Sequence, residues 1–156
     1  EILANNAALD LLYNKINFPF MIVSFIFYFL GGYLLYSALF AAIGSAVDSE
    51  SDTQQFMLPI TIPLIFGFVI AEMSIANPAS QAAFWASFVP LTSPVVMMVQ
   101  VAVGVSVIQF VVSALLLIIG FLLTVWIASR IYRIGILSYG KKPSWKELFR
   151  WIFMKN

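Results

Sequence analysis

The stretch NPASQAAFWASFVPLTSPVVMMVQVAVGVS, Asn77–Ser106, contains no charged side chain and is divided by prolines. It belongs to a longer charge-free run from Met73 to Ser129. A helix crosses the hydrocarbon core of a membrane in about 20 residues, so this run is too long for one span. Because proline interrupts a helix, the stretch is predicted to form short apolar helices before a full span begins.

The prolines also mark where these helices begin and end. Asn77-Pro78 is typical of an N-cap followed by proline at the first helical position, and Ser93-Pro94 repeats the pattern. Pro90 ends the first helix. We expect two short helices that enter one membrane face without crossing, and neighbouring helices must then cover their non-helical backbone. Their predicted ranges are about 78–89 and 94–103.

The composition excludes a soluble fold and most enzymes. The chain is 62% hydrophobic and 10% charged, whereas soluble domains carry about 25% charged residues. It contains no cysteine or histidine, so disulfides, thiolate chemistry, histidine-based triads and the usual zinc sites are excluded. A phosphate-binding loop and a lysine inside a span are also missing from the sequence. We therefore expect no catalytic residues and no metal site.

The charge-free stretches predict an all-α, polytopic membrane helix bundle. The first residue is Glu1 and no signal-peptide pattern follows, so the chain is interpreted as the C-terminal piece of a longer protein. Residues 1–17 are expected to end an external segment, 18–135 to form the transmembrane region, and 136–156 to form a basic tail. The three predicted spans are about 18–46, 55–75 and 107–131.

The basic residues set the predicted orientation. From Arg130 onward the chain has seven basic residues and one acid, whereas Lys15 is the only basic residue before it. Lysine and arginine concentrate in cytoplasmic flanks, so the C-terminus is predicted to be cytoplasmic. The 48–54 loop then lies inside, and residues 77–104 lie outside. The residues expected to anchor this end to membrane lipid are Arg130, Arg133, Lys141, Lys142 and Trp145.

The end of the tail is predicted to form an amphipathic helix. Ser144 and Glu147 have the spacing of a capping box. One face of the helix is apolar, which favours a position in the membrane interface. The alternative is that this face packs against a partner domain. The apolar residues are Trp145, Leu148, Phe149, Ile152 and Phe153.

Three features of the spans are candidates for function. Glu72 is the only ionisable residue deep in an apolar span, and such residues often mark a transport path. Because it lies near the outer end, a structural or interfacial position is the alternative. With Ser74 and Asn77 it forms the predicted substrate path.

The prolines and small residues of the first two spans leave two interpretations each. Pro59 and Pro63 free two helical carbonyls, which either line a cation site or mark a simple bend. Ser37, Ala41 and Ser45 form a stripe of small residues. The stripe permits close packing of another helix, within one bundle or at a subunit interface.

Four stretches resemble the permeases of bacterial ABC transporters of the type-2 exporter class. The most specific is the C-terminal RIYRIGILSYGKKPSWKEL with the preceding LLTVWIASR, and the others are LGGYLLYSALFAAIGSAVDSESDTQQ, the Asn77-Pro78 element and FVPLTSPVVMMV. The nearest branch is that of the sodium-export permeases. The resemblance covers nearly all of residues 18–152. One departure is Gln100, where relatives often carry an arginine.

The resemblance implies a transport subunit of a bacterial inner membrane, made of the last three of six membrane helices. Export of sodium or another small substrate would be driven by a separate cytoplasmic ABC ATPase, which holds ATP and magnesium, so no cofactor is expected on this chain. A second permease copy would complete the path, and no nucleic acid is expected. Asp48, Glu50 and Asp52 are candidate ATPase contacts or a solvated loop. The rival function is a non-transporting scaffold that recruits partners through its basic tail.

Overall fold

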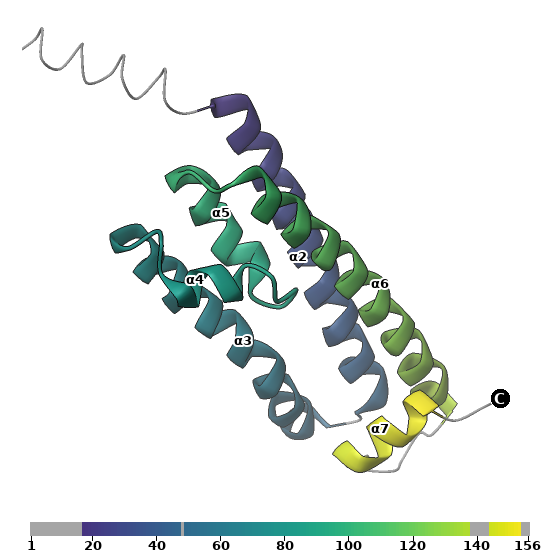
Figure 1. Ribbon diagram of the computed structural model, residues 1–156. Coiled ribbons are helices and arrows are strands. Elements are labelled where there is room, and N and C mark those ends of the chain that lie inside the picture. Colours follow the sequence, from purple (N-terminus) through teal and green to yellow (C-terminus); the bar gives the residue numbers. More distant parts are fainter. Residues whose placement is uncertain (1–16, 48, 138–143, 154–156) are drawn as a thin grey trace, which may run out of the picture.

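The computed structural model describes residues 17–47, 49–137 and 144–153, and its regular elements there are all helices. Three of them are long and apolar enough to cross a membrane, namely Phe18–Ala46, Glu50–Ala76 and Val107–Ile134. The chain is therefore an all-α membrane helix bundle (Figure 1). Asp48, Lys141 and Lys142 lie outside the described residues. The helices are α2 (Phe18–Ala46), α3 (Glu50–Ala76), α4 (Gln81–Ala86), α5 (Ser93–Val103), α6 (Val107–Leu137) and α7 (Trp145–Phe153).

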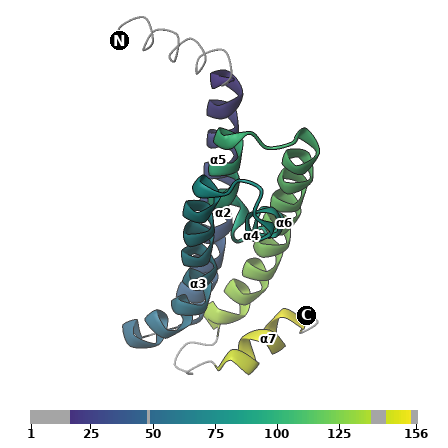
Figure 2. The ribbon, with the colours of Figure 1, turned by 60° about the vertical axis from the view of Figure 1, so that its left-hand side comes forward.

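The three long helices define two ends of the bundle. α2 and α6 lie side by side and run in the same direction, and α3 returns antiparallel to them (Figure 1). α7 lies across one end, which is called the α7 end below (Figure 2). α4 and α5 enter from the opposite end and lie between the long helices. Together with the turn that joins them, they form the hairpin, residues 81–103.

α3 begins at Glu50 rather than near Gln55, where the sequence placed the start of the second span. Ser49 caps the helix, because its hydroxyl accepts a hydrogen bond from the Asp52 amide at 3.2 Å. Acidic residues also favour the positive end of the helix dipole. Glu50 and Asp52 therefore belong to the first helical turn and not to a loop.

The Asn77-Pro78 element has a different role from the predicted N-cap. Asn77 is the C-cap of α3, and its amide bonds to the Met73 carbonyl at 3.0 Å. Ser80 caps α4 instead, because its hydroxyl accepts from the Ala83 amide at 3.3 Å. The first short helix is thus Gln81–Ala86 and not 78–89.

α5 and α6 also differ slightly from the predicted ranges. The N-cap of α5 is Thr92, one residue before Ser93, and its side chain caps nothing. Its hydroxyl instead donates to the Ala86 carbonyl at 2.6 Å, which closes the hairpin turn. α6 extends to Leu137 instead of ending near Ile131, since no proline interrupts it.

The hairpin turn reaches the middle of the bundle because each long helix offers a glycine there. A Cβ built on Gly120 would lie 2.5 Å from Pro90 Cβ, and one on Gly32 would lie 2.6 Å from Pro94 Cβ. A Cβ on Gly67 would lie 3.4 Å from the Thr92 backbone. Any larger side chain at Gly32 or Gly120 would displace a rigid proline ring.

α7 packs against the end of its own bundle. Leu148 is buried there with residues of α2, α3 and α6, and Ile152 lies against the same cluster. Both bonds of the predicted capping box are present between Ser144 and Glu147. Phe153, expected on the same apolar face, is exposed. The inward side of α7 thus contacts protein, while the exposed Phe153 remains available to membrane or partner.

Arg130 connects α6 to α7. Its Nη1 donates to the Ile152 carbonyl at 2.9 Å, and the guanidinium lies 4.5 Å from the centre of the Trp126 ring. We expect Arg130→Ala to speed amide hydrogen exchange in α7 by at least about tenfold, since a hydrogen bond from a charged donor contributes roughly 1.5–3 kcal/mol. Arg133→Ala is the matched control, because Arg133 is exposed. Equal exchange in both variants would show that Arg130 does not hold α7.

Candidate functional site

The first polar contact of the hairpin joins α5 to α3. Gln100 is only 4% exposed. Its Nε2 donates to Ser74 Oγ at 2.8 Å and to the Pro78 carbonyl at 3.3 Å. Because a membrane core offers no water, such bonds fix which helix faces meet. Gln100 therefore ties the second half of the hairpin to the end of α3.

A second polar contact joins the end of α4 to α6. Gln109 Nε2 donates to Ser87 Oγ at 3.0 Å. The hydroxyl of Ser113, one helical turn further along α6, donates to the Ser87 carbonyl at 2.5 Å. Ser87 and Ser113 are both fully buried. These bonds satisfy polar groups that the hairpin would otherwise expose to an apolar surrounding.

A third contact joins the turn to α2. The hydroxyl of Tyr36, a buried residue, donates to the Leu91 carbonyl at 2.7 Å. The hairpin is thus hydrogen-bonded to all three long helices, and the glycine contacts surround the same turn. This arrangement holds a non-helical segment at mid-depth without leaving its backbone in lipid.

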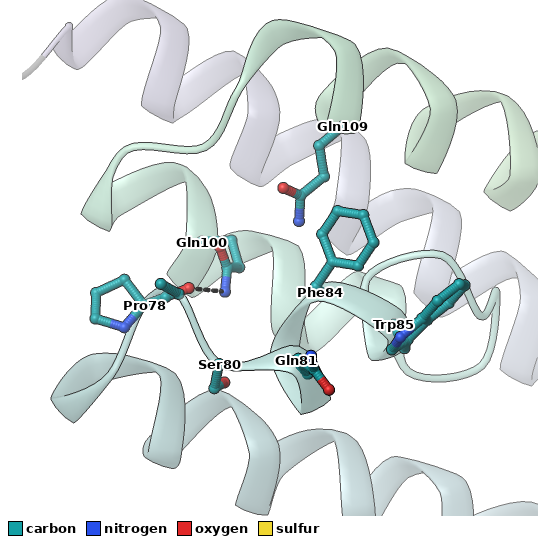
Figure 3. A pocket seen from close by; sticks show the side chains of 8 residues that line it. Pro78, Ser80, Gln81, Phe84, Trp85, Gln100 and Gln109 are labelled. Atoms are coloured by element: carbon teal, nitrogen blue, oxygen red, sulfur yellow. Dashed lines mark hydrogen bonds between the residues drawn. The ribbon is translucent and has the colours of Figure 1, made fainter.

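A cavity of about 360 Å³ opens beside the first two contacts (Figure 3). Three carboxamides and two aromatic rings line it, and no charged side chain does. Gln109 comes from α6 and points into the space between Gln100 and Phe84 (Figure 3). The lining residues are Pro78, Ala79, Ser80, Gln81, Phe84, Trp85, Gln100 and Gln109.

A second cavity, of about 330 Å³, is mainly apolar and lies between α2 and the α5 side of the bundle. Three tyrosines of α2 line it, and Tyr28 and Tyr36 are buried whereas Tyr33 is 63% exposed. Ser37 and Pro94 also line this space.

The structure separates the residues predicted to form a substrate path. Glu72 and Asn77 are exposed, whereas Ser74 is fully buried against Gln100. Residues two apart in a helix point in nearly opposite directions, so Glu72 and Ser74 do not share a face. Within the described residues, no group of three or more acidic side chains could hold a metal ion.

The other predicted residues lie as follows. Ser37 and Ala41 are exposed and Ser45 is partly exposed, although Ser37 also lines the second cavity, toward α5. Pro59 and Pro63 lie inside the continuous helix α3. At the α7 end, Glu50 is exposed and Asp52 is partly buried. For Trp145, only the position of its backbone at the start of α7 is described.

Sequence reasoning did not identify the polar contacts that position the hairpin. Gln109, Ser87 and Ser113 are polar residues within an apolar run, and this is the signal that could have selected them. Gln100 was noticed only as a departure from relatives. Gly67 and Gly120 gave no comparable signal, because a glycine in a long helix does not reveal which neighbour approaches it.

Comparison with known proteins supports a membrane transport subunit. Over 129 residues the chain is 26% identical to the uncharacterized protein MJ1024 of Methanocaldococcus jannaschii, with 82% of this chain and 32% of that protein covered. Over 124 residues it is 30% identical to the uncharacterized protein YhaP of Bacillus subtilis, with 79% and 30% covered. The chain thus spans about a third of the length of these relatives.

No solved structure matches the chain. The sequence pattern described as ABC-2 family transporter protein matches residues 3–130, which include α2, the hairpin and most of α6. The chain therefore belongs to the ABC-2 family of transporter proteins.

Proposed function

We propose that the chain forms part of the permease of an ATP-driven exporter, with ATP hydrolysed by a separate ABC ATPase. The observation that carries this proposal is the hairpin, which enters from one end and stops at mid-depth between three spanning helices. A transporter needs a barrier that closes one side of its path. The hairpin is proposed to brace the helices that form this barrier, because its polar bonds reach α2, α3 and α6.

The path itself is proposed to run along the exposed face of α3. Glu72 lies on this face about one helical turn before the end of α3, and an ionisable side chain that faces lipid there is costly to leave without a polar partner. A second copy of the chain, or another part of the protein, would therefore face Glu72 and enclose a polar route. The exposed stripe of Ser37 and Ala41 offers a further surface for close helix packing.

Sodium is the proposed substrate because of the sequence resemblance to sodium-export permeases. The Glu72 carboxylate supplies the kind of oxygen ligand that sodium prefers. Since Ser74 points to the opposite side, the remaining ligands would come from the facing surface and not from this chain.

The ATPase is proposed to dock at the α7 end. Glu50 is exposed in the first turn of α3, which begins at the α7 end of the bundle. Basic residues of an ATPase would pair with Glu50 and Asp52. Because Leu148 of α7 belongs to the cluster formed by the ends of α2, α3 and α6, movement of the ATPase at this end would act on that cluster.

Reconstitution tests the exporter against the scaffold. The full-length protein and its partner ABC ATPase would be placed together in proteoliposomes. We expect sodium gradients to form with ATP but not with a non-hydrolysable analogue, and sodium to stimulate ATP hydrolysis. A scaffold would show neither response. Transport of another solute in the absence of sodium would support the exporter proposal and refute sodium as the substrate.

Glu72→Gln tests the path. The substitution removes the charge and retains the size, so we expect ATP-driven sodium transport to fall at least about tenfold, equal to roughly 1.4 kcal/mol. Glu147→Gln is the matched control, since glutamine also serves in a capping box. Equal transport by both variants would remove Glu72 from the path.

Cysteine labelling tests the orientation, and the cysteine-free chain is suited to it. Ala79 and Lys146 are both exposed and lie at opposite ends of the bundle. We expect a membrane-impermeant maleimide to label Ala79→Cys in intact cells and to label Lys146→Cys only after permeabilisation. The opposite result would invert the proposed topology and place the ATPase at the other end.

A further inference from the structure

We propose that the cavity beside the hairpin binds a neutral, hydroxyl-bearing group of the size of one sugar ring. Its volume of about 360 Å³ is within the range of about 300–1,000 Å³ typical of small-molecule sites. It lies apart from Glu72, so the inference does not depend on the proposed sodium path. The proposed ligand would bind at the hairpin and not on the sodium path.

The carboxamides lining the cavity retain free hydrogen-bonding capacity. The two bonds of Gln100 use its Nε2 and leave Oε1 as an acceptor. Gln109 donates only from Nε2 to Ser87, so its Oε1 is also available. In the described part of the chain, no hydrogen bond reaches either Oε1 or involves the side-chain amide of Gln81. Amides from three elements, α4, α5 and α6, are thus available to one cavity.

The absence of charge among the lining residues selects the ligand class. An ionised group in this cavity would lose hydration without gaining an opposite charge, which is costly at the edge of an apolar region. Carboxamides both donate and accept hydrogen bonds, as hydroxyl groups do. A neutral group with several hydroxyls therefore matches the lining better than a carboxylate, a phosphate or an amine.

The aromatic side chains supply the apolar wall that a sugar ring requires. Phe84 and Trp85 meet edge to face, with ring centres 5.6 Å apart and an interplanar angle of 81°. They are 45% and 68% exposed, so their faces are accessible. The C–H face of a sugar can rest on such a ring while its hydroxyls reach the carboxamides. Trp85 would also suit the membrane interface alone, and the test must separate these roles.

The test uses the full-length protein in phosphatidylcholine nanodiscs, with Trp85 as the only tryptophan after every other one, Trp126, Trp145 and Trp151 included, is replaced by phenylalanine. Methyl glucoside is added as a free sugar. A second set of nanodiscs carries glucosyl diacylglycerol, and a third carries diacylglycerol alone. We expect a saturable change in Trp85 fluorescence with a glucosyl ligand. Saturation by methyl glucoside identifies a free sugar, and a response to the glycolipid alone identifies a lipid headgroup.

Substitutions of the cavity residues separate sugar binding from a role of Trp85 as a membrane anchor. Gln81→Ala and Gln109→Leu are each expected to weaken the glucosyl response about fivefold, since one hydrogen bond contributes about 1 kcal/mol. Gln81 is exposed and caps nothing, so its loss should leave folding unchanged. Gln55→Ala is the matched control, because Gln55 is exposed and lies near the start of α3, at the α7 end of the bundle. Charged glucuronate should bind at least about tenfold more weakly than methyl glucoside.

Two outcomes would overturn the proposal. A response to diacylglycerol equal to that of the glycolipid, with none to methyl glucoside, would mean that Trp85 only senses the interface. A saturable glucosyl response that Gln81→Ala and Gln109→Leu leave unchanged would place the sugar elsewhere. Neither outcome affects ATP-driven sodium transport, so failure here is distinguishable from failure of the exporter proposal.

Discussion

Replacing Gly120 by alanine is expected to lower the free energy of unfolding by about 2 kcal/mol, although alanine favours helices more than glycine does. The added Cβ would lie 2.5 Å from Pro90 Cβ and 2.6 Å from Pro90 Cγ. A proline ring cannot rotate away, so either the hairpin turn or α6 must shift. Such a shift would also strain the bonds from Tyr36 and Ser113 to the turn. Thermal denaturation of the purified protein in detergent measures the effect.

Gly44 provides the matched control for this prediction. A Cβ on Gly44 of α2 meets no atom within 4 Å. Gly44→Ala should therefore leave stability unchanged or raise it by up to about 1 kcal/mol, through helix propensity alone. Opposite signs for the two substitutions would establish the close contact between Gly120 and Pro90. If Gly120→Ala stabilised the protein as Gly44→Ala does, the hairpin turn could not lie against α6 as described.

Replacing Gln100 by leucine is expected to lower the free energy of unfolding by about 1–2 kcal/mol. Leucine cannot donate, so Ser74 Oγ and the Pro78 carbonyl would lose the partner that they share. Ser74 is fully buried, and an unpaired hydroxyl there carries its desolvation cost. Hydrogen exchange should increase in α5 and at the end of α3, where the bond joins the two helices.

A double-mutant cycle with Ser74→Ala separates this bond from other effects of leucine. If the contact exists, Gln100→Leu should cost about 1 kcal/mol less in the Ser74→Ala background, since the buried hydroxyl has been removed. Gln55→Leu is the control, because Gln55 is exposed on α3. Additive costs in the cycle would contradict a direct bond between Gln100 and Ser74.

Much of the fold could be predicted because lipid imposes a length on each apolar stretch. Charge-free runs located the three spans, and the prolines between Asn77 and Pro94 located the hairpin. The ends were less predictable, because Asn77 closes α3 and Ser80 opens α4, although either could cap a helix. The acids near Glu50 suggested a loop, but at the start of a helix they favour it instead.

The candidate site could be predicted much less well. Glu72 attracted attention as a lone charge, and the structure places it on the side of α3 opposite to Ser74. The cavity depends on Gln81, Gln100 and Gln109, which come from three separate helices. These residues come together only through tertiary packing, which their spacing along the sequence does not predict. Burying a neutral amide also costs less free energy than burying a charge. A glutamine in an apolar run is therefore a weaker signal of function than a lone glutamate.

The glycine contacts around Pro90 and Pro94 have a mechanical consequence. Gly32 and Gly120 meet the prolines near the middle of their helices, with no flexible side chain between them to absorb movement. Each helix is therefore expected to pivot at this point rather than slide past it. When α2 and α6 separate on one side of the pivot, they approach each other on the other side. A single rocking motion would then change the spacing of the helices at the two ends of the bundle in opposite senses.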